Sequence, residues 1–98
     1  MVKEIKEKEF KDVIKEGKVL VDCYADWCGP CRMLSPVVDE LSEERKDMKF
    51  YKLNIDNAES IAMEYGIMSI PNLLLFEDGK LKNQLIGFRT KEELKKDI

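Results

Sequence analysis

Residues 18–25 form a nearly unbroken apolar run, and residues 27–31 follow directly with Trp-Cys-Gly-Pro-Cys. The run is rich in residues that favour β-strands, and continuous apolar sequence of this length is typical of a strand buried on both faces. We predict that this strand gives way to a helix near Gly29, which would put both thiols at the helix start. Two thiols three positions apart can there close a small disulfide ring and open it again, which suits electron exchange with other disulfides.

Length and composition limit the chain to one small domain. Its 98 residues, 44% of them apolar, suffice for one hydrophobic core, so we expect a single domain over residues 1–98. No apolar stretch is long enough to span a bilayer, and residues 1–6 lack the apolar core of a signal peptide. We therefore expect a cytoplasmic protein that does not bind membranes.

Charge and cysteine usage narrow the chemistry further. The net charge is −3 and charges of both signs are mixed along the chain, so no basic stripe predicts nucleic-acid binding. Three cysteines without a signal peptide are a poor disulfide framework, and the absence of histidine removes the usual general base and metal ligand. A Cys-X-X-Cys pair can also be half of a zinc site, but only Cys23 remains as a further thiol ligand. Zinc stays an alternative, and we expect no metal or other cofactor.

The apolar pattern predicts strands and helices in the order βαβαβαββα. Strand–helix–strand units favour parallel pairing through right-handed crossovers, and a final hairpin adds antiparallel strands. We therefore expect an α/β fold with a mixed five-stranded sheet and helices on both faces. The predicted strands are residues 2–5, 18–25, 49–55, 72–76 and 81–86, and the predicted helices are residues 7–16, 29–45, a short one capped by Asp56 or Asn57 and ended by Gly66, and one that begins with a capping box at Thr90.

The predicted helix start gives the two cysteines different properties. The sulfur of Cys28 would lie near unpaired backbone N–H groups and the positive end of the helix dipole, which lower the pKa of a thiol. Cys31 lies one turn further along the helix, where it can attack a mixed disulfide formed at Cys28. Gly29 and Pro30 form a short, conformationally restricted link between the two cysteines. We expect this link to tune the redox properties of the pair.

Residues 21–32, which read Val-Asp-Cys-Tyr-Ala-Asp-Trp-Cys-Gly-Pro-Cys-Arg, resemble the active-site stretch of the thioredoxin family. Pro36 stands where the family's long helix is kinked, and residues 52–56 resemble the family's third strand. Residues 65–76 are similar to the segment that contains its cis-proline, and Gly87 matches its late glycine. The matches run in the right order along nearly the whole chain, and they imply the thioredoxin fold.

The resemblance implies roles for four residues. Cys28 resembles the attacking thiol and Cys31 the resolving thiol, and the two would form the reversible disulfide. Asp22 matches a buried aspartate that takes the proton from the resolving thiol; burial inside residues 18–25 would raise its pKa toward the range of a general base. Lys52 matches a lysine that tunes this aspartate. The alternatives are a water-facing aspartate and a solvated lysine.

The resemblance also implies an apolar surface on which substrates dock around the sulfurs. Pro71 resembles the cis-proline whose neighbouring backbone pairs with an extended substrate, although a trans turn is the ordinary state of a proline. Met68 would add soft contact area, and we expect Cys23 to be a small buried core thiol. The docking residues would be Trp27, Gly66, Ile67, Ile70, Pro71 and Gly87, each of which, taken singly, plain packing also explains.

The function implied by the resemblance is reduction of protein disulfides. A flavin-dependent reductase would restore the thiols, and the protein would be a monomer. Two alternatives remain at this point: a disulfide oxidant or isomerase of the same fold, and a binding subunit that does not use its thiols. The Gly29–Pro30 pair resembles that of the reductants.

Overall fold

The computed structural model describes residues 2–98. Each expected strand and helix is present with small shifts at its ends, except that the predicted helix 7–16 divides into a 3-10 turn and a short α-helix. In chain order the elements are β1 (Lys3–Ile5), the 3-10 helix η1 (Glu7–Glu9), α1 (Phe10–Ile14), β2 (Lys18–Tyr24), α2 (Gly29–Glu44), β3 (Lys49–Asn54), the 3-10 helix η2 (Ile55–Asn57), α3 (Glu59–Glu64), β4 (Asn72–Glu77), β5 (Lys80–Ile86) and α4 (Lys91–Asp97).

The five strands form one mixed sheet in the order β1-β3-β2-β4-β5. β2, which leads to the cysteine pair, therefore lies at the centre, parallel to β3 and antiparallel to β4. Val19, Leu20 and Val21 of this strand have no exposed surface, because the sheet is covered on both sides. The mixed sheet and its buried central strand are confirmed.

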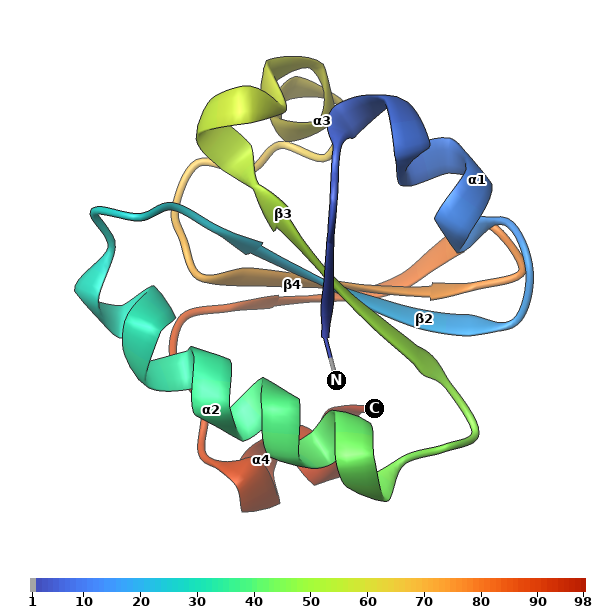
Figure 1. Cartoon of the computed structure of the whole chain (residues 1–98), viewed down its shortest axis with the longest axis vertical. Coiled ribbons are helices and arrows are strands. Elements are labelled where there is room, and N and C mark those ends of the chain that lie inside the picture. The colour runs from blue at the N-terminus through green and yellow to red at the C-terminus, as the bar shows by residue number, and fades with distance from the viewer. Residues whose placement is uncertain (1) are drawn as a thin grey trace.

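Helices pack on both faces of the sheet (Figure 1): α2 and α4 lie on one side, and α1 and α3 lie on the other. Leu34, Val38 and Leu41 recur at helical spacing along α2 and are buried against the sheet and Leu94 of α4. Full burial of one such side chain stabilises the fold by about 1.5–3 kcal/mol. This apolar stripe therefore holds in place the helix whose first turn carries the cysteines.

The hairpin and the last helix are built as the sequence predicts. β4 and β5 are joined through Asp78 and Gly79, whose positive φ angles of 51° and 86° suit the twist of a two-residue hairpin turn. The Thr90 hydroxyl accepts the backbone N–H of Glu93, and the Glu93 carboxylate accepts the N–H of Thr90. This capping box begins α4. Within residues 2–98, no helix is both long and apolar enough to cross a membrane.

The start of α3 differs from the prediction. Asp56 and Asn57 lie in η2 and do not cap the helix; its N-cap residue is Ala58, which has no capping side chain. The cap comes from a distant part of the chain, because the Glu7 carboxylate accepts both the backbone N–H of Ser60, at 2.9 Å, and the Ser60 hydroxyl. A side chain from η1 thus takes the place of the local cap that the sequence suggested.

Replacing Glu7 with glutamine is expected to lower the melting temperature at pH 7, and this deficit is expected to shrink in acid. The bonds from Ser60 hold the pKa of Glu7 below its ordinary 4.5. A carboxylate whose pKa is lowered by folding stabilises the protein above its unfolded pKa, and that stabilisation disappears as pH falls through its folded pKa. Thermal unfolding at about pH 7 and about pH 3 measures the effect, with the exposed Glu16→Gln as control. An equal deficit at both pH values would contradict the prediction.

Candidate active site

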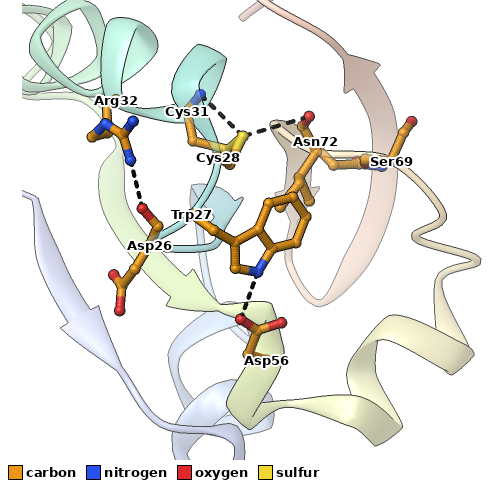
Figure 2. The surroundings of a disulfide bond; sticks show 9 residues. Asp26, Trp27, Cys28, Cys31, Arg32, Asp56, Ser69 and Asn72 are labelled. Atoms are coloured by element: carbon orange, nitrogen blue, oxygen red, sulfur yellow. Dashed lines mark hydrogen bonds between the residues drawn. A yellow bond between two sulfur atoms is a disulfide. The ribbon is translucent and has the colours of Figure 1, made fainter.

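The two cysteines lie at the start of α2 and are joined as a disulfide (Figure 2). Cys28 has an extended backbone and is the N-cap residue, and its sulfur accepts the backbone N–H of Cys31 at 3.2 Å. Gly29 and Pro30 are the first helical residues, where the missing N–H of proline costs no helical hydrogen bond. The Cys28 sulfur therefore lies where unpaired N–H groups and the helix dipole favour negative charge.

The loop before β4 faces the disulfide. The Ile70–Pro71 peptide bond is cis, as the family resemblance implies, and the Ile70 carbonyl oxygen lies 3.8 Å from Sγ of Cys28. The backbone N–H of Gly87 donates to the Pro71 carbonyl at 2.9 Å. The residue that follows β5 thus holds the cis-proline loop, and this loop brings Ile70 into contact with the sulfur of Cys28.

Asp22 lies in β2 beside the cysteines and is only 4% exposed. With Cys31 and Lys52 it lines a small cavity of about 150 Å³, and its Oδ1 has no hydrogen-bond partner among the described residues. Burial raises the pKa of Asp22 to about 7; the charge of Lys52 opposes this rise and that of Asp39 adds to it. A carboxyl group with this pKa can take up and release a proton near neutral pH.

Two basic residues, Lys52 and Arg32, line the same cavity. Lys52 lies opposite Asp22 in the neighbouring strand β3, and its Nζ is 5.9 Å from the centre of the Tyr24 ring. Arg32 also lines the cavity, and its guanidinium donates to the backbone carbonyl of Asp26 at 2.6 Å, as Figure 2 shows. Arg32 therefore ties the segment that precedes the cysteines to the first turn of α2.

An apolar groove of about 320 Å³ lies next to the loop that contacts the disulfide. Trp27 is 69% exposed, and its indole N–H donates to the Asp56 carboxylate at 2.9 Å (Figure 2). The groove reaches the sulfur of Cys28 through Ile70, whose carbonyl contacts that sulfur. We call this surface the apolar groove; its lining residues are Trp27, Ile55, Ile67, Met68, Ser69 and Ile70.

The apolar groove contains some, but not all, of the docking residues expected from the sequence. Trp27, Ile67 and Ile70 line it, whereas Gly66, Pro71 and Gly87 do not. The φ of 61° at Gly66 allows the chain to turn after α3. Sequence reasoning missed Ile55 and the Asp56 carboxylate that holds the indole. The sequence contained a signal for this, because Trp27 follows one predicted strand and Asp56 follows the next. Residues that follow neighbouring parallel strands lie at the same edge of the sheet.

Two further residues complete the surroundings. Cys23 has no exposed surface and packs in the core between the sheet and the helices α1 and α3, and burial raises the pKa of its thiol. This confirms the expected core thiol. Asp39, which raises the pKa of Asp22, was not anticipated, because its helical position gave no sign of which strand residue it would face. Within residues 2–98 no three Cys, Asp or Glu side chains are grouped to hold a metal ion.

The hydrogen bond between Trp27 and Asp56 suggests a mild effect on substrate binding. Asp56→Ala removes the acceptor that holds the exposed indole, at a cost of about 1 kcal/mol for one such bond. The family resemblance implies that protein disulfides dock around Trp27, so we expect KM for such a substrate to rise about two- to fivefold with little change in kcat. Steady-state kinetics check this, with Glu59→Ala as an exposed acidic control on α3. A lower kcat at unchanged KM would show that the bond serves the chemistry instead.

A cysteine pair at a helix start, with a titratable carboxyl group on one side and an open apolar groove on the other, can exchange electrons with disulfides of other molecules. On a mixed five-stranded sheet with helices on both faces, this arrangement defines a class: the small dithiol–disulfide oxidoreductases.

Comparisons with known proteins lead from this class to a family. The family model described as Thioredoxin matches residues 1–98. The chain is 46% identical over 95 residues to a thioredoxin of Listeria monocytogenes, which covers 96% of this chain and 92% of that protein. It is 49% identical over 78 residues to a thioredoxin of Mycoplasmoides gallisepticum, covering 80% and 78% respectively. A solved structure of a mutant thioredoxin from Halobacterium salinarum has a TM-score of 0.91 at 38% identity, covering 98% of this chain and 86% of that one. The chain belongs to the thioredoxin family.

Membership of this family decides between the functions left open by the sequence. The protein is a dithiol–disulfide oxidoreductase with protein-disulfide reductase activity, and its redox-active pair is Cys28 and Cys31. Its substrates are proteins that contain disulfides, and a reductase is its partner. Neither an oxidant or isomerase nor a thiol-independent binding subunit is favoured.

Proposed function

We propose that Cys28 is the attacking thiol and Cys31 the resolving thiol in the reduction of protein disulfides. The Cys28 thiolate attacks one substrate sulfur, the substrate S–S bond breaks, and the released thiolate takes a proton from solvent. Cys31 then gives its proton to Asp22 and attacks the sulfur of Cys28. The mixed disulfide breaks and the second substrate thiolate leaves. The substrate has then gained two electrons, and the Cys28–Cys31 pair has been oxidised to its disulfide.

The position of the Cys28 sulfur is the observation that carries this assignment. It is the N-cap of α2 and accepts the Cys31 N–H at 3.2 Å. A hydrogen bond and a helix N-terminus both favour a thiolate, which is the reactive form in disulfide exchange. The carbonyl of Ile70, 3.8 Å from the same sulfur, marks the side on which the substrate backbone would lie. Cys31 instead lines the inner cavity with Asp22, which supports its role in the second step.

Asp22 supports the second step as general base. The cavity that it shares with Cys31 connects the carboxyl group with the resolving thiol, and a pKa of about 7 suits proton uptake near neutral pH. Lys52 lines the same cavity, where its charge favours the ionised carboxylate and so limits the rise in the pKa of Asp22. We assign Lys52 a tuning role and no contact with substrate. The short Gly29–Pro30 link would tune the reduction potential of the pair.

Substrate binding is assigned to the surface around the sulfurs. An extended substrate segment that is covalently attached to Cys28 must pass the cis-proline loop, because the Ile70 carbonyl contacts that sulfur. The side chains that follow its half-cystine would then enter the apolar groove beside Trp27 and Ile67. Gly87, held to Pro71, would form the other rim, and Gly66 would contribute only by shaping the start of this loop.

The remaining assignments concern the setting of the reaction. We propose that residues 1–98 act as one domain and as a monomer in the cytoplasm, within an electron-transport route that maintains cellular thiols. The family match over residues 1–98 supports the single domain. A flavin-dependent thioredoxin reductase would regenerate the dithiol. Equilibration with glutathione buffers tests the direction of electron flow: we expect a potential more reducing than that of glutathione, and a strongly oxidising potential would contradict it.

Reduction of insulin with dithiothreitol as electron source tests the cysteine roles. We expect the wild-type protein to accelerate precipitation of the free insulin chains and Cys28→Ser to leave only the background rate. Cys23→Ala is the matched control, since this third thiol is buried away from the groove, and it should retain activity. Replacing dithiothreitol with a flavin-dependent thioredoxin reductase tests the partner. Activity of Cys28→Ser equal to that of the wild type would overturn the assignment.

A further inference from the structure

We propose that Met68 is a site of oxidation by hydroperoxides, and that its sulfoxide weakens the binding of protein substrates in the apolar groove. The inference rests on the proposed docking role of this groove. It adds a modification site that regulates docking without touching the reacting sulfurs.

The position of Met68 is the first observation. It belongs to the segment between α3 and β4 and is 96% exposed, more than any other large apolar side chain among the described residues. It lines the apolar groove with Trp27 and Ile70. Because Ile70 contacts the sulfur of Cys28 and lines the same groove as Met68, a substrate joined to that sulfur would enter the groove that the Met68 thioether lines.

The three cysteine sulfurs compete poorly for an oxidant when the protein is in its disulfide form; the exposed Met33 and Met63 do compete, but neither lines the apolar groove. Cys28 and Cys31 are then bonded to each other and carry no thiolate. Cys23 is fully buried, and burial raises the pKa of its thiol, so it too lacks the reactive form. Thioether oxidation needs no deprotonation, and the exposed methionine at the groove is therefore open to attack.

The chemical step is a two-electron oxygen transfer. A lone pair on the Met68 sulfur attacks the distal oxygen of a hydroperoxide, and the O–O bond breaks. The proton on the transferred oxygen passes to the leaving oxygen, so the sulfur becomes a sulfoxide and the peroxide is reduced to water or an alcohol. Thioether oxidation of this kind is enzymatically reversible, unlike the higher oxidation states of cysteine.

The sulfoxide changes what the groove can bind. The thioether is soft and apolar and adapts to the shape of a substrate side chain. The sulfoxide carries a strong dipole that is hydrogen-bonded to water, and covering it with an apolar partner costs free energy. We expect KM for a protein disulfide to rise on the order of five- to tenfold, while kcat and the rate with a small disulfide stay unchanged.

Peroxide treatment followed by kinetics tests the modification. The disulfide form is incubated with hydrogen peroxide, the peroxide is removed, and oxidation of each methionine is measured by peptide mass spectrometry. Met68→Leu should keep its KM through the treatment. Met63→Leu is the matched control: Met63 is 77% exposed but does not line the groove, so this variant should remain as sensitive as the wild type. Equal sensitivity of Met68→Leu and wild type would overturn the proposal, as would failure of Met68 to oxidise when Met63 does.

A permanent polar substitution gives a second measurement that does not depend on peroxide. Met68→Gln places a dipole of similar size at the same position, and we expect it to raise KM for insulin while leaving the rate with oxidised glutathione unchanged. Met63→Gln should change neither. Normal kinetics of Met68→Gln would overturn the inference even though untreated wild-type protein reduces insulin. Inactivity of the untreated protein, in contrast, would contradict the proposed function itself.

Discussion

Cys31→Ser is expected to convert the protein from a catalyst into a covalent trap for its substrates. Cys28 remains at the N-cap of α2, where its sulfur can still attack a disulfide. The second step then has no nucleophile, so the mixed disulfide persists until an external thiol cleaves it. We expect turnover to fall by at least about a thousandfold. Non-reducing electrophoresis after mixing with a disulfide substrate should show an adduct that dithiothreitol removes.

The reciprocal variant distinguishes the two sulfurs. Cys28→Ser keeps Cys31. In the wild type the backbone N–H of Cys31 donates to the sulfur of Cys28, while Cys31 itself lines the cavity that it shares with Asp22. We expect this variant to form no adduct at the same concentration and time. An adduct with Cys28→Ser and none with Cys31→Ser would mean that the proposed order of attack is reversed. The double variant with Cys28→Ser and Cys31→Ser cannot form an adduct through either sulfur, so it measures the background signal of the gel.

Asp22→Asn is expected to stabilise the protein in mild alkali and to slow it at the same time. Folding raises the pKa of Asp22 from 3.8 to about 7. Between these values the folded protein holds a proton that the unfolded chain has released, so stability falls as pH rises through this window. The full penalty, about 4 kcal/mol, is present above about pH 7. The asparagine variant does not ionise and escapes it.

Denaturant unfolding at two pH values measures this penalty. The difference in unfolding free energy between Asp22→Asn and wild type should approach about 4 kcal/mol near pH 8.5 and vanish near pH 3.5. Asp26→Asn, in the exposed loop before Trp27, is the matched control for the loss of an exposed aspartate. A difference that is the same at both pH values would mean that packing, not ionisation, distinguishes the variant.

The kinetic effect of the same variant tests the proposed proton transfer. Without the carboxylate, Cys31 must give its proton to water, and we expect the resolving step to slow by about tenfold or more near pH 7. The initial attack by Cys28 should keep its rate, because it precedes this transfer. Rapid-mixing kinetics that separate the two steps check this, and equal slowing of both would point to a general loss of structure.

The sequence predicted those features that depend on local patterns or on a contiguous motif. The nearly unbroken apolar run of residues 18–25 predicts a buried central strand, because such a run is typical of a strand covered on both faces. The capping box at Thr90 and the turn at Gly79 also follow from neighbouring residues alone. For the same reason the contiguous motif is enough to identify Cys28 and Cys31 as a redox pair.

Features that depend on distant partners could not be predicted in this way. The start of α3 was predicted wrongly because its cap comes from Glu7, which lies far away in the sequence. The carboxylate that holds Trp27 and the charge of Asp39 near Asp22 likewise depend on the tertiary arrangement. Local patterns predict helices and strands, while contacts between them fix the electrostatics of the site.

Because Cys23 is completely buried, the accessibility of its thiol reports whether the protein is folded. In the native reduced state only two sulfurs should react with a thiol-specific label, because the third is enclosed beneath α1 and α3. A count of three labelled sites would therefore report that the sheet has opened. Each variant described above that keeps all three cysteines can be screened for correct folding by this count before its kinetics are interpreted.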